Sequence, residues 1–322
     1  MARVALITGI AGQDGFYLSQ LLHEKGYELC GLDRPGKRPA ENLCTRVLEV
    51  DLVSAPLGDL LDEIRPDEIY NLAGLSQVAA SFEDPAGFAL TNGVGAIRLL
   101  EAARRHRDRL GREVRFYQAS SSEMFGSAGR TPKNETTPFH PQSPYACSKV
   151  LAHLQTINFR EAFGLFACCG ILFNHESPSR PKQFVTRKIT AAAARIKLGL
   201  QERLTLGNVE VRRDWGFAGD YVEAMWQMLQ QDAPDDYVIA TGETHSVREF
   251  GQAVFAHLGL DWAAQVTTDP RLLRPSDIQC VCGDASKARD KLGWRPRVAF
   301  QELVRMMADH DLQLAREERK GT

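Results

Sequence analysis

Apolar and polar positions alternate along the first half of the chain in blocks that predict strands and helices in turn. An apolar run at residues 4–7 is closed by Thr8-Gly9, and apolar residues at helical spacing follow it up to Lys25-Gly26. Further elements follow: strands at 28–32, 46–50, 68–72, 114–119 and 166–172, and helices at about 57–64, 91–105 and 145–163. Strands that alternate with helices predict an α/β fold with a doubly wound, parallel sheet of the Rossmann type.

The character of the chain changes after Asn174. Segments 177–182 and 212–216 are polar connections rich in proline or arginine, which indicates a second, smaller lobe of mixed α/β structure that binds substrate. We expect a first domain over residues 1–173 and a second mainly over 174–322, with a part near 214–241 returning to the first.

Composition excludes several classes of protein. Of the 322 residues, 43% are hydrophobic and 25% charged, as in a globular chain, and the net charge of −2 gives no overall basic excess for nucleic acid. Seven cysteines lack the spacing of a disulfide framework or a zinc half-site, and every apolar run is broken before the roughly 20 residues that span a membrane. We therefore expect a cytoplasmic protein without a metal and without a nucleic-acid or membrane partner.

Three glycines, Gly9, Gly12 and Gly15, lie between the first predicted strand and the first helix. Such glycines let the backbone approach a pyrophosphate, whose charge the helix N-terminus attracts. Asp33 lies 18 residues after Gly15, at the end of the second strand, where an acid can hold an adenosine ribose. The alternative is a tight turn that happens to contain three glycines, and the strand–loop–helix context favours the dinucleotide site.

Tyr145 and Lys149 stand one helical turn apart on the same face of a predicted helix. A phenol with an ordinary pKa of about 10 becomes a usable base near neutrality when a cation stabilises the phenolate. The serine run 120–122 ends a predicted core strand, and a hydroxyl, a Tyr and a Lys together can oxidise an alcohol to a ketone. The alternatives are a surface pair on an amphipathic helix and a serine that caps a helix.

Glu123 follows this serine run and is open to two interpretations. Its carboxylate could act as a general base and remove a proton from the carbon next to a newly made ketone. It could equally cap the helix that follows.

Cationic residues gather in the polar connections of the second lobe: Arg180, Lys182, Lys188, Arg212, Arg213 and Arg274. Scattered Arg and Lys are usually surface charges, but several around one cleft would suit a diphosphate, which Arg binds through two hydrogen bonds at once. His175, in the same region, is more typical of a structural hydrogen-bonding residue than of a catalyst.

Seven stretches, spread nearly from end to end, resemble a known family: Thr8–Gly15, Gln118–Gly126, Ser143–Lys149, Gly170–Pro178, Phe184–Ile189, Arg213–Tyr221 and Leu292–Arg297. The chain is similar to the extended short-chain dehydrogenase/reductases that act on nucleotide sugars, and among them to the GDP-mannose 4,6-dehydratase family. The stretch at 170–178 and the Val-Thr-Arg-Lys segment at 185–188 are far more specific than the glycine turn or the Tyr-Lys pair, which the whole superfamily shares.

The resemblance implies dehydration of GDP-mannose to GDP-4-keto-6-deoxy-mannose without net redox change. Tyr145, held by Lys149 and assisted by Ser121, would take the proton from the sugar O4 while hydride leaves C4 for the nicotinamide. Glu123 would then remove the C5 proton, water would leave from C6, and the hydride would return to C6.

The resemblance also implies the residues that would line the two ligands. The cofactor residues are Gly9, Gly12, Gln13, Asp14, Gly15, Asp33, Arg34, Asp51, Leu52, Asn71, Leu72, Ala73, Tyr145 and Lys149. The substrate residues are Ser76, Asn174, Glu176, Arg180, Lys188, Gly207, Arg213 and Arg274.

Two departures from the family pattern bear on the cofactor and the assembly. Ser121 stands where the family usually has Thr and keeps a hydroxyl. The segment Leu32–Pro39 replaces an Arg-Arg-Ser-Ser segment and a long connection, which bind the 2′-phosphate of NADP and help to build a tetramer. We expect NADP bound through Arg34, with NAD as the alternative because Asp33 can accept both ribose hydroxyls, and we expect a homodimer, with a tetramer as the alternative.

Three other functions are compatible with the same residues: a dehydratase of a related GDP-sugar such as a manno-heptose, a nucleotide-sugar 4-epimerase, and a catalytically silent NAD(P)-binding sensor. An epimerase needs no base at C5, so Glu123 distinguishes it from a dehydratase. A silent sensor has no need for Ser121, Tyr145 and Lys149 together.

Overall fold

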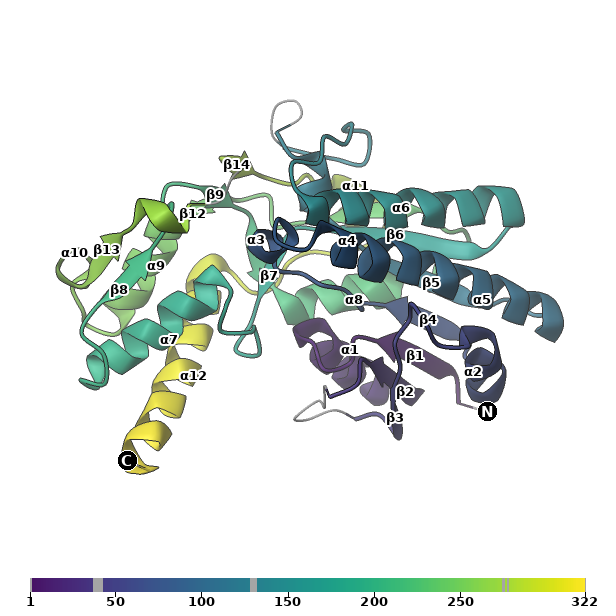
Figure 1. The fold of residues 1–322 in the computed structure, drawn as a ribbon, viewed down its shortest axis with the longest axis horizontal. Helices are drawn as coiled ribbons and strands as arrows, with labels where there is room; N and C mark the ends of the chain where they lie inside the picture. Colours follow the sequence, from purple (N-terminus) through teal and green to yellow (C-terminus); the bar gives the residue numbers. More distant parts are fainter. Residues whose placement is uncertain (1, 37–42, 128–131, 274–275, 277, 322) are drawn as a thin grey trace.

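The computed structural model describes residues 2–36, 43–127, 132–273, 276 and 278–321 (Figure 1). Its first part contains β1 (Val4–Thr8), α1 (Gln13–Glu24), β2 (Glu28–Asp33), β3 (Arg46–Glu49), α2 (Leu57–Ile64), β4 (Glu68–Asn71), α3 (Val78–Ser81), α4 (Pro85–Phe88), η1 (Ala89–Val94), α5 (Gly95–Leu110), β5 (Arg115–Ser121), η2 (Ser122–Phe125), α6 (Pro144–Phe163) and β6 (Phe166–Leu172). Its second part contains β7 (Asn174–Glu176), α7 (Val185–Lys197), β8 (Leu204–Leu206), β9 (Arg212–Arg213), β10 (Trp215–Phe217), α8 (Ala218–Met228), β11 (Asp236–Ile239), β12 (His245–Ser246), α9 (Val247–His257), α10 (Trp262–Gln265), β13 (Val266–Thr268), η3 (Pro270–Leu272), β14 (Cys280–Val281), α11 (Ser286–Leu292) and α12 (Phe300–Gly321).

The central sheet has the strand order β11-β6-β5-β4-β1-β2-β3, and its strands run parallel. β6 is buried along its whole length, as expected for a parallel strand that helices cover on both faces. The predicted doubly wound Rossmann-type sheet is therefore confirmed. β1 pairs with β2 on one side and with β4 on the other, so the strand order reverses at β1. Folds of this kind bind ligands beyond the carboxyl ends of the strands at such a reversal.

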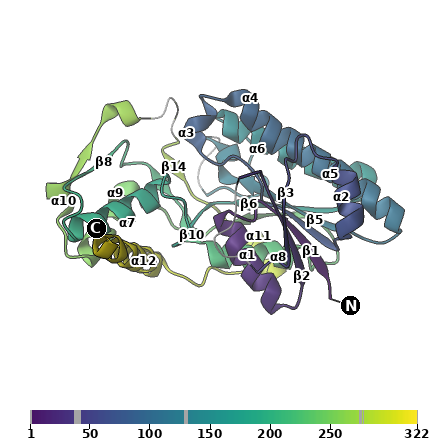
Figure 2. The same ribbon diagram turned by 60° about the horizontal axis from the view of Figure 1, so that its bottom comes forward.

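Helices cover both faces of the sheet (Figures 1 and 2). α1, α8 and α11 pack on one face, in a core that includes Leu18 and Met225. α2, α5 and α6 pack on the other face, in a core that includes Leu61 and Leu99. In the part of the chain that the structure describes, no helix is both long and apolar enough to cross a membrane.

A second lobe lies beside the carboxyl edge of the sheet and has its own core around Phe250 and Leu303 (Figure 1). It consists mainly of α7, α9 and α12 with short strand pairs. α8 and β11 lie in the first lobe, where β11 is the edge strand beside β6. α11 also packs in the first lobe, together with Trp294, and this second return of the chain is not among the expectations from sequence.

Three local features differ from the expected boundaries. α1 begins at Gln13, so Gly15 lies inside the helix rather than before it. β5 runs on to Ser121, which places that hydroxyl on the last residue of the strand. The helix expected at 91–105 begins with the π-helical stretch η1, and π-helical turns are frequent at functional sites.

Candidate active site

Close backbone contacts explain the glycines of the first turn. Gly9 has a φ of +72°, and a Cβ there would lie 2.9 Å from the backbone of Ala73. A Cβ on Gly15 would lie 2.6 Å from the carbonyl oxygen of Ile10. Gly12 is the N-cap of α1 and has no side chain to occupy the first N–H groups of that helix, which are the groups that bind phosphate.

Asp33 is the last residue of β2 and turns its carboxylate back towards the glycine turn. One oxygen accepts a hydrogen bond from the N–H of Ala11 and the other from the N–H of Arg34, both at 2.8 Å. Asp33 therefore stabilises the turn, and each oxygen keeps a lone pair that can accept from a ribose hydroxyl. Arg34 lies beyond the strand and is exposed.

A network of side chains joins the first turn of α1 to the start of the second lobe. The Gln13 amide donates to the carbonyl of His175 at 3.0 Å and accepts from the Ser177 hydroxyl at 2.7 Å. Both ring nitrogens of His175 face acceptors: Nδ1 lies 2.8 Å from the carbonyl of Phe173, and Nε2 lies 2.9 Å from the Asp14 carboxylate. Two acceptors at the two ring nitrogens favour the imidazolium form, and the ring bridges the two lobes.

The pKa values of this pair agree with that charge state. Burial alone would lower the pKa of His175, but the charge and hydrogen bond of Asp14 outweigh burial and raise it. Burial alone would raise the pKa of Asp14, but the imidazolium lowers it below its usual value. His175 is thus a structural residue, as expected from sequence, and its position between the lobes is visible only in the fold.

Tyr145 and Lys149 are buried side chains on one face of α6, beside the end of β5. Burial raises the pKa of Tyr145 to about 12, against the opposing effect of a hydrogen bond with Ser121. Burial lowers the pKa of Lys149 to about 8. The Lys149 ammonium donates to the carbonyl of Ala119 at 3.0 Å, the one hydrogen bond that the described residues give it, and an ammonium has three donors.

The Glu123 carboxylate is not the cap of the short helix η2. Ser121 caps that helix, because its hydroxyl oxygen accepts from the N–H of Glu123 at 3.3 Å. The described residues provide no hydrogen bond to the Glu123 carboxylate itself. Its charge adds to the effect of burial in raising the pKa of Tyr145, which indicates that the two groups are neighbours.

Asn92, a buried residue of the π-helical stretch η1, is part of the site that the sequence analysis misses. Its amide accepts from the N–H of Leu75 at 2.8 Å and donates to the carbonyl of Leu75 and to Ser148 at 3.0 Å each. A Cβ on Gly74 would lie 2.9 Å from the Asn92 oxygen and 3.6 Å from the Lys149 ammonium. Asn92 therefore holds the loop after β4 against α6, and no local motif marks it.

Two predicted substrate residues, Glu176 and Arg180, contact each other. Glu176 is buried, accepts from the Thr186 hydroxyl at 2.6 Å, and lies 3.1 Å from Nε of Arg180. The Arg180 guanidinium lies 3.8 Å from the centre of the Phe184 ring. Its charge lowers the pKa of Tyr145, against the larger effect of burial. Glu176 is thus engaged by the protein itself.

Other predicted substrate residues are spread more widely. Lys188 is exposed, and its ammonium donates to a backbone carbonyl at 2.9 Å. Arg213 is buried and donates to the carbonyls of Arg212 and Ile278 at 3.0 and 2.7 Å. Arg274 lies outside the described residues.

The remaining predicted residues mostly follow strand ends at the carboxyl edge of the sheet. Asp51 and Leu52 come after β3, and Leu72, Ala73 and Ser76 come after β4. Asn174 begins β7 directly beyond β6, and Gly207 follows β8 in the second lobe. The sheet thus brings most of the predicted cofactor residues to one edge, and their roles stay predictions.

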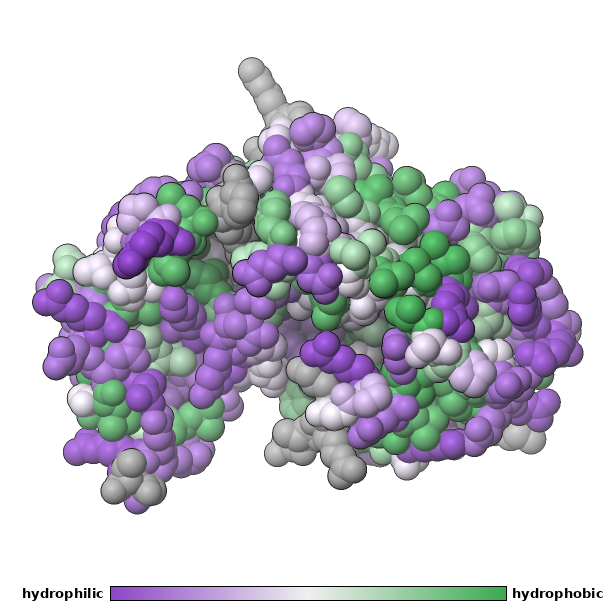
Figure 3. Space-filling view, viewed as in Figure 1, coloured by the Kyte–Doolittle hydropathy of each residue, from purple (hydrophilic) through white to green (hydrophobic). Residues whose placement is uncertain are grey.

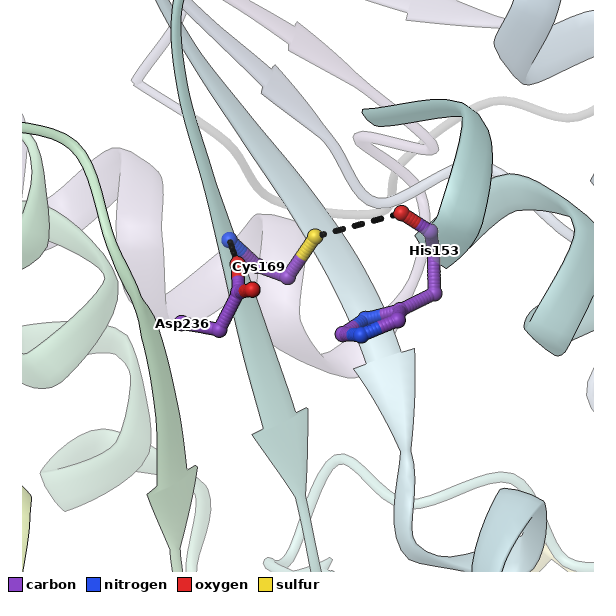
Figure 4. A group of neighbouring side chains, drawn as sticks. All are labelled: His153, Cys169 and Asp236. Carbon is purple, nitrogen blue, oxygen red and sulfur yellow. Dashed lines mark hydrogen bonds between the residues drawn. The ribbon is translucent and has the colours of Figure 1, made fainter. Parts of the chain in front are cut away.

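A further polar cluster lies deeper in the first lobe, where ligand atoms of His153, Cys169 and Asp236 come within 4.8 Å of one another (Figure 4). Both Asp236 oxygens accept from Arg160, at 2.9 and 2.8 Å. Nδ1 of His153 is hydrogen-bonded to Ser120 at 2.9 Å, and burial raises the pKa of the Cys169 thiol well above its usual value. A neutral thiol and a carboxylate already paired with Arg are poor ligands, so this donor set does not suit a metal ion.

The parallel sheet, the glycine turn and the group formed by Ser121, Tyr145 and Lys149 define an extended short-chain dehydrogenase/reductase. Residues 6–307 match the model of the family described as GDP-mannose 4,6 dehydratase. The chain belongs to this family, and the resemblance stated from its sequence is confirmed.

Individual relatives agree with the family model. The chain is 54% identical to GDP-mannose 4,6 dehydratase 1 of Arabidopsis thaliana, over 98% of this chain and 92% of that protein. It is 46% identical to GDP-mannose 4,6 dehydratase of Homo sapiens, over 97% and 92%. Among solved structures, UDP-glucose 4-epimerase of Thermus thermophilus in complex with NAD has a TM-score of 0.84 and 28% identity, over 96% of this chain and 98% of that one.

Proposed function

We propose that this protein is a hydro-lyase that converts GDP-mannose to GDP-4-keto-6-deoxy-mannose with a bound nicotinamide cofactor. The observation that carries the proposal is the position of the Glu123 carboxylate, which is not the cap of η2 and neighbours Tyr145, in a chain of this family. Simple alcohol oxidation has no use for this carboxylate, whereas elimination of water needs a base. Within the described residues no disulfide joins any of the seven cysteines, which supports action in a reducing compartment such as the cytoplasm.

The residues around the glycine turn fit a dinucleotide. The uncapped N–H groups at the start of α1 suit a pyrophosphate, and the tight contacts of Gly9 and Gly15 keep the surface of the turn free of side chains. A bound nicotinamide would supply an acceptor and then a donor of hydride.

Each side chain of the site has a distinct task in the proposed reaction. Tyr145 takes the proton from the sugar O4, because Lys149 and Ser121 can stabilise its phenolate. Glu123 takes the proton from C5, which is acidic next to the C4 ketone, and a proton passes to the C6 hydroxyl, which leaves as water. Hydride lost from C4 is regained at C6 while C5 takes up a proton that comes from solvent, so the reaction consumes no external reductant.

We propose NADP as the cofactor, with NAD as the alternative that the T. thermophilus structure illustrates. Arg34 is exposed directly after the strand, where it can reach a 2′-phosphate, whereas the lone pairs that Asp33 keeps suit the ribose hydroxyls of NAD. Dissociation constants for NADP and NAD test this in the wild type, Arg34→Ala and Asp33→Asn. We expect Arg34→Ala to lose the preference for NADP and Asp33→Asn to strengthen it; a tenfold preference of the wild type for NAD would contradict the proposal.

We propose a homodimer formed by the face of η1 and α6. Leu90, Leu151 and Leu154 are 48%, 37% and 51% exposed there, and Figure 3 shows apolar surface over α4, α6 and the start of α5. Light scattering tests the assembly: Leu154→Glu should give monomers. Leu314→Glu, on α12 and 38% exposed, should leave the assembly unchanged. A tetramer in the wild type, or a dimer in Leu154→Glu, would contradict this part of the proposal.

The reaction is tested by incubating the purified protein with GDP-mannose without added reductant and measuring the mass of the product. Loss of one water supports dehydration. Faster turnover of UDP-glucose, or of a GDP-manno-heptose, would move the assignment to another nucleotide sugar. Inversion at C4 without loss of mass would identify a 4-epimerase, and absence of turnover on the whole panel would favour an NAD(P)-binding sensor.

A further inference from the structure

A buried ion pair connects the C-terminal helix to the segment that enters the second lobe. Arg187 on α7 and Asp311 on α12 are 5% and 2% exposed, and their helices lie side by side (Figure 1). Nε of Arg187 donates to both Asp311 oxygens at 3.0 and 2.8 Å, and Nη2 donates to one of them at 2.8 Å. Thr190 adds a hydrogen bond from its hydroxyl to Asp311. The carboxylate therefore fixes the orientation of the guanidinium.

The other end of the Arg187 guanidinium holds a turn of the backbone. Nη1 donates to the carbonyl of Arg180 at 2.8 Å and to the carbonyl of Pro178. These carbonyls belong to the turn 177–180, which is closed by a hydrogen bond from the N–H of Arg180 to the carbonyl of Ser177 at 3.0 Å. A planar guanidinium that is held on one edge can orient the groups on its other edge, which a lysine cannot do.

The turn 177–180 reaches the proposed catalytic centre from two positions. Ser177 is fully buried and donates to Gln13 at 2.7 Å, which ties the turn to the start of α1. Arg180 stacks on Phe184 and pairs with Glu176 at 3.1 Å, and its charge lowers the pKa of Tyr145 against the larger effect of burial. Displacement of the turn would therefore move a cation relative to the phenol.

We propose that Asp311 is a positioning residue of the active site, which acts through Arg187 to hold the turn 177–180, and Arg180 with it, against the start of α1. Asp311 touches neither substrate nor cofactor in this arrangement. The inference rests on the proposed function for its kinetic test, because the proton transfer by Tyr145 is the step that it affects.

Several charged groups affect the pKa of Tyr145, and only one of them depends on Asp311. Burial raises the pKa of Tyr145, Glu123 and Asp14 raise it further, and Arg180, which is itself paired with Glu176 at 3.1 Å, lowers it. The Lys149 ammonium lies 5.9 Å from the centre of the Tyr145 ring. Of the two cations, only Arg180 depends on the Asp311 relay. Loss of the relay should therefore raise the pH at which the phenolate forms and leave the effect of Lys149 in place.

The kinetic experiment compares the pH dependence of kcat for GDP-mannose in Asp311→Asn, Arg187→Lys and Arg180→Gln. We expect the acidic limb of each profile to move to higher pH by about one unit, the lower end of the effect of a nearby opposite charge. Asp311→Asn should add little to Arg180→Gln, since both remove the same interaction. Asp309→Asn is the matched control, because this exposed residue of α12 pairs with His257 at the surface, and its profile should equal that of the wild type.

Two outcomes would overturn the proposal: a wild-type profile in Asp311→Asn when Arg180→Gln is shifted, or shifts of the two variants that add in full. Should Asp311→Asn fail to fold, the paired change Asp311→Leu with Arg187→Met keeps the core filled and removes the relay, and it should show the same shift.

A crystal structure of the variant tests the relay without turnover. The turn 177–180 should be displaced in the Asp311→Asn protein and unchanged in the Asp309→Asn protein. An undisplaced turn would overturn the proposal. A wild-type protein without activity on GDP-mannose would contradict the proposed function alone. The crystal structures would still show whether Asp311 holds the turn 177–180 in place.

Discussion

The two sides of the active site hold their polar groups in opposite ways. On the side of the sheet, Tyr145 and Lys149 are buried, and burial shifts the pKa of each against its ionised form. On the side of the second lobe, Arg187 is paired with Asp311 inside the protein. The side chains on the first side keep hydrogen-bonding capacity for ligands, which lowers the stability of the folded protein. The ion pair on the second side makes that side rigid. Substitutions on the first side should therefore remove chemistry without unfolding the protein.

The largest effect is expected from Tyr145→Phe. The ring and its packing remain, and only the oxygen that exchanges a proton with the sugar O4 is lost. We expect turnover of GDP-mannose to fall by roughly 10⁴-fold or more, the upper end of the range for a general acid–base group. Cofactor affinity, measured by titration, should stay nearly unchanged. Tyr237→Phe, on β11, is the control with full activity, and substantial activity in Tyr145→Phe would exclude the phenol as the base.

Glu123→Gln should separate the two halves of the reaction. The amide keeps the size of the side chain and lacks the basic oxygen, so oxidation at C4 could proceed while removal of the C5 proton stalls. We expect dehydration to slow by roughly 10²–10⁴-fold, together with loss of solvent deuterium incorporation at C5. Glu161→Gln, exposed on α6, should behave as the wild type. Unchanged deuterium incorporation in Glu123→Gln would show that another group is the base.

Lys149→Met should stabilise the ligand-free protein at neutral pH, because the buried ammonium has a pKa of about 8 instead of 10.5. The unfolded chain binds more protons between these values, so the stability of the wild type rises with pH across this window. The difference between 8 and 10.5 corresponds to about 3 kcal/mol. We expect denaturant unfolding to show a gain of this order at pH 7 that disappears above pH 10.5, with no gain in the exposed control Lys182→Met. A loss of stability in Lys149→Met would contradict the statement that the buried Lys149 lowers the stability of the ligand-free protein.

The smallest effect is expected at the link between the two sides, the pair of Asp14 and His175. The raised pKa of His175 contributes stability below its ordinary value of 6.5 and loses it as pH rises through the folded value. The lowered pKa of Asp14 contributes above its ordinary 3.8, so the pair is strongest between about pH 4 and 6.5. His175→Gln should therefore cost about 1.5 kcal/mol at pH 5.5, the lower end of the range for a hydrogen bond to a charged group, and less at pH 8.5. A cost that does not depend on pH would show that the pair is uncharged.

Much of the first lobe could be predicted from sequence because its signals are local. Alternating apolar runs marked β1 to β6, and a spacing of four residues placed Tyr145 and Lys149 on one helical face. The glycine turn was recognisable because the close approach of backbones at Gly9 and Gly15 excludes a side chain. Each of these features depends on residues within about one element of the chain.

The tertiary structure decided what depends on distant contacts. Asn92 joins the site through a π-helical turn, and Asp311 reaches Arg187 across 124 positions of sequence. The cap of η2 is Ser121 and not Glu123, a choice between two neighbouring side chains that spacing alone leaves open. Local periodicity specifies which face of a helix or strand is buried, but it does not specify the partner on the other side of that face. The partner is set by packing between elements, and this packing pairs Arg187 with Asp311 in the second lobe and leaves Lys149 of the first lobe with hydrogen-bonding capacity for a ligand.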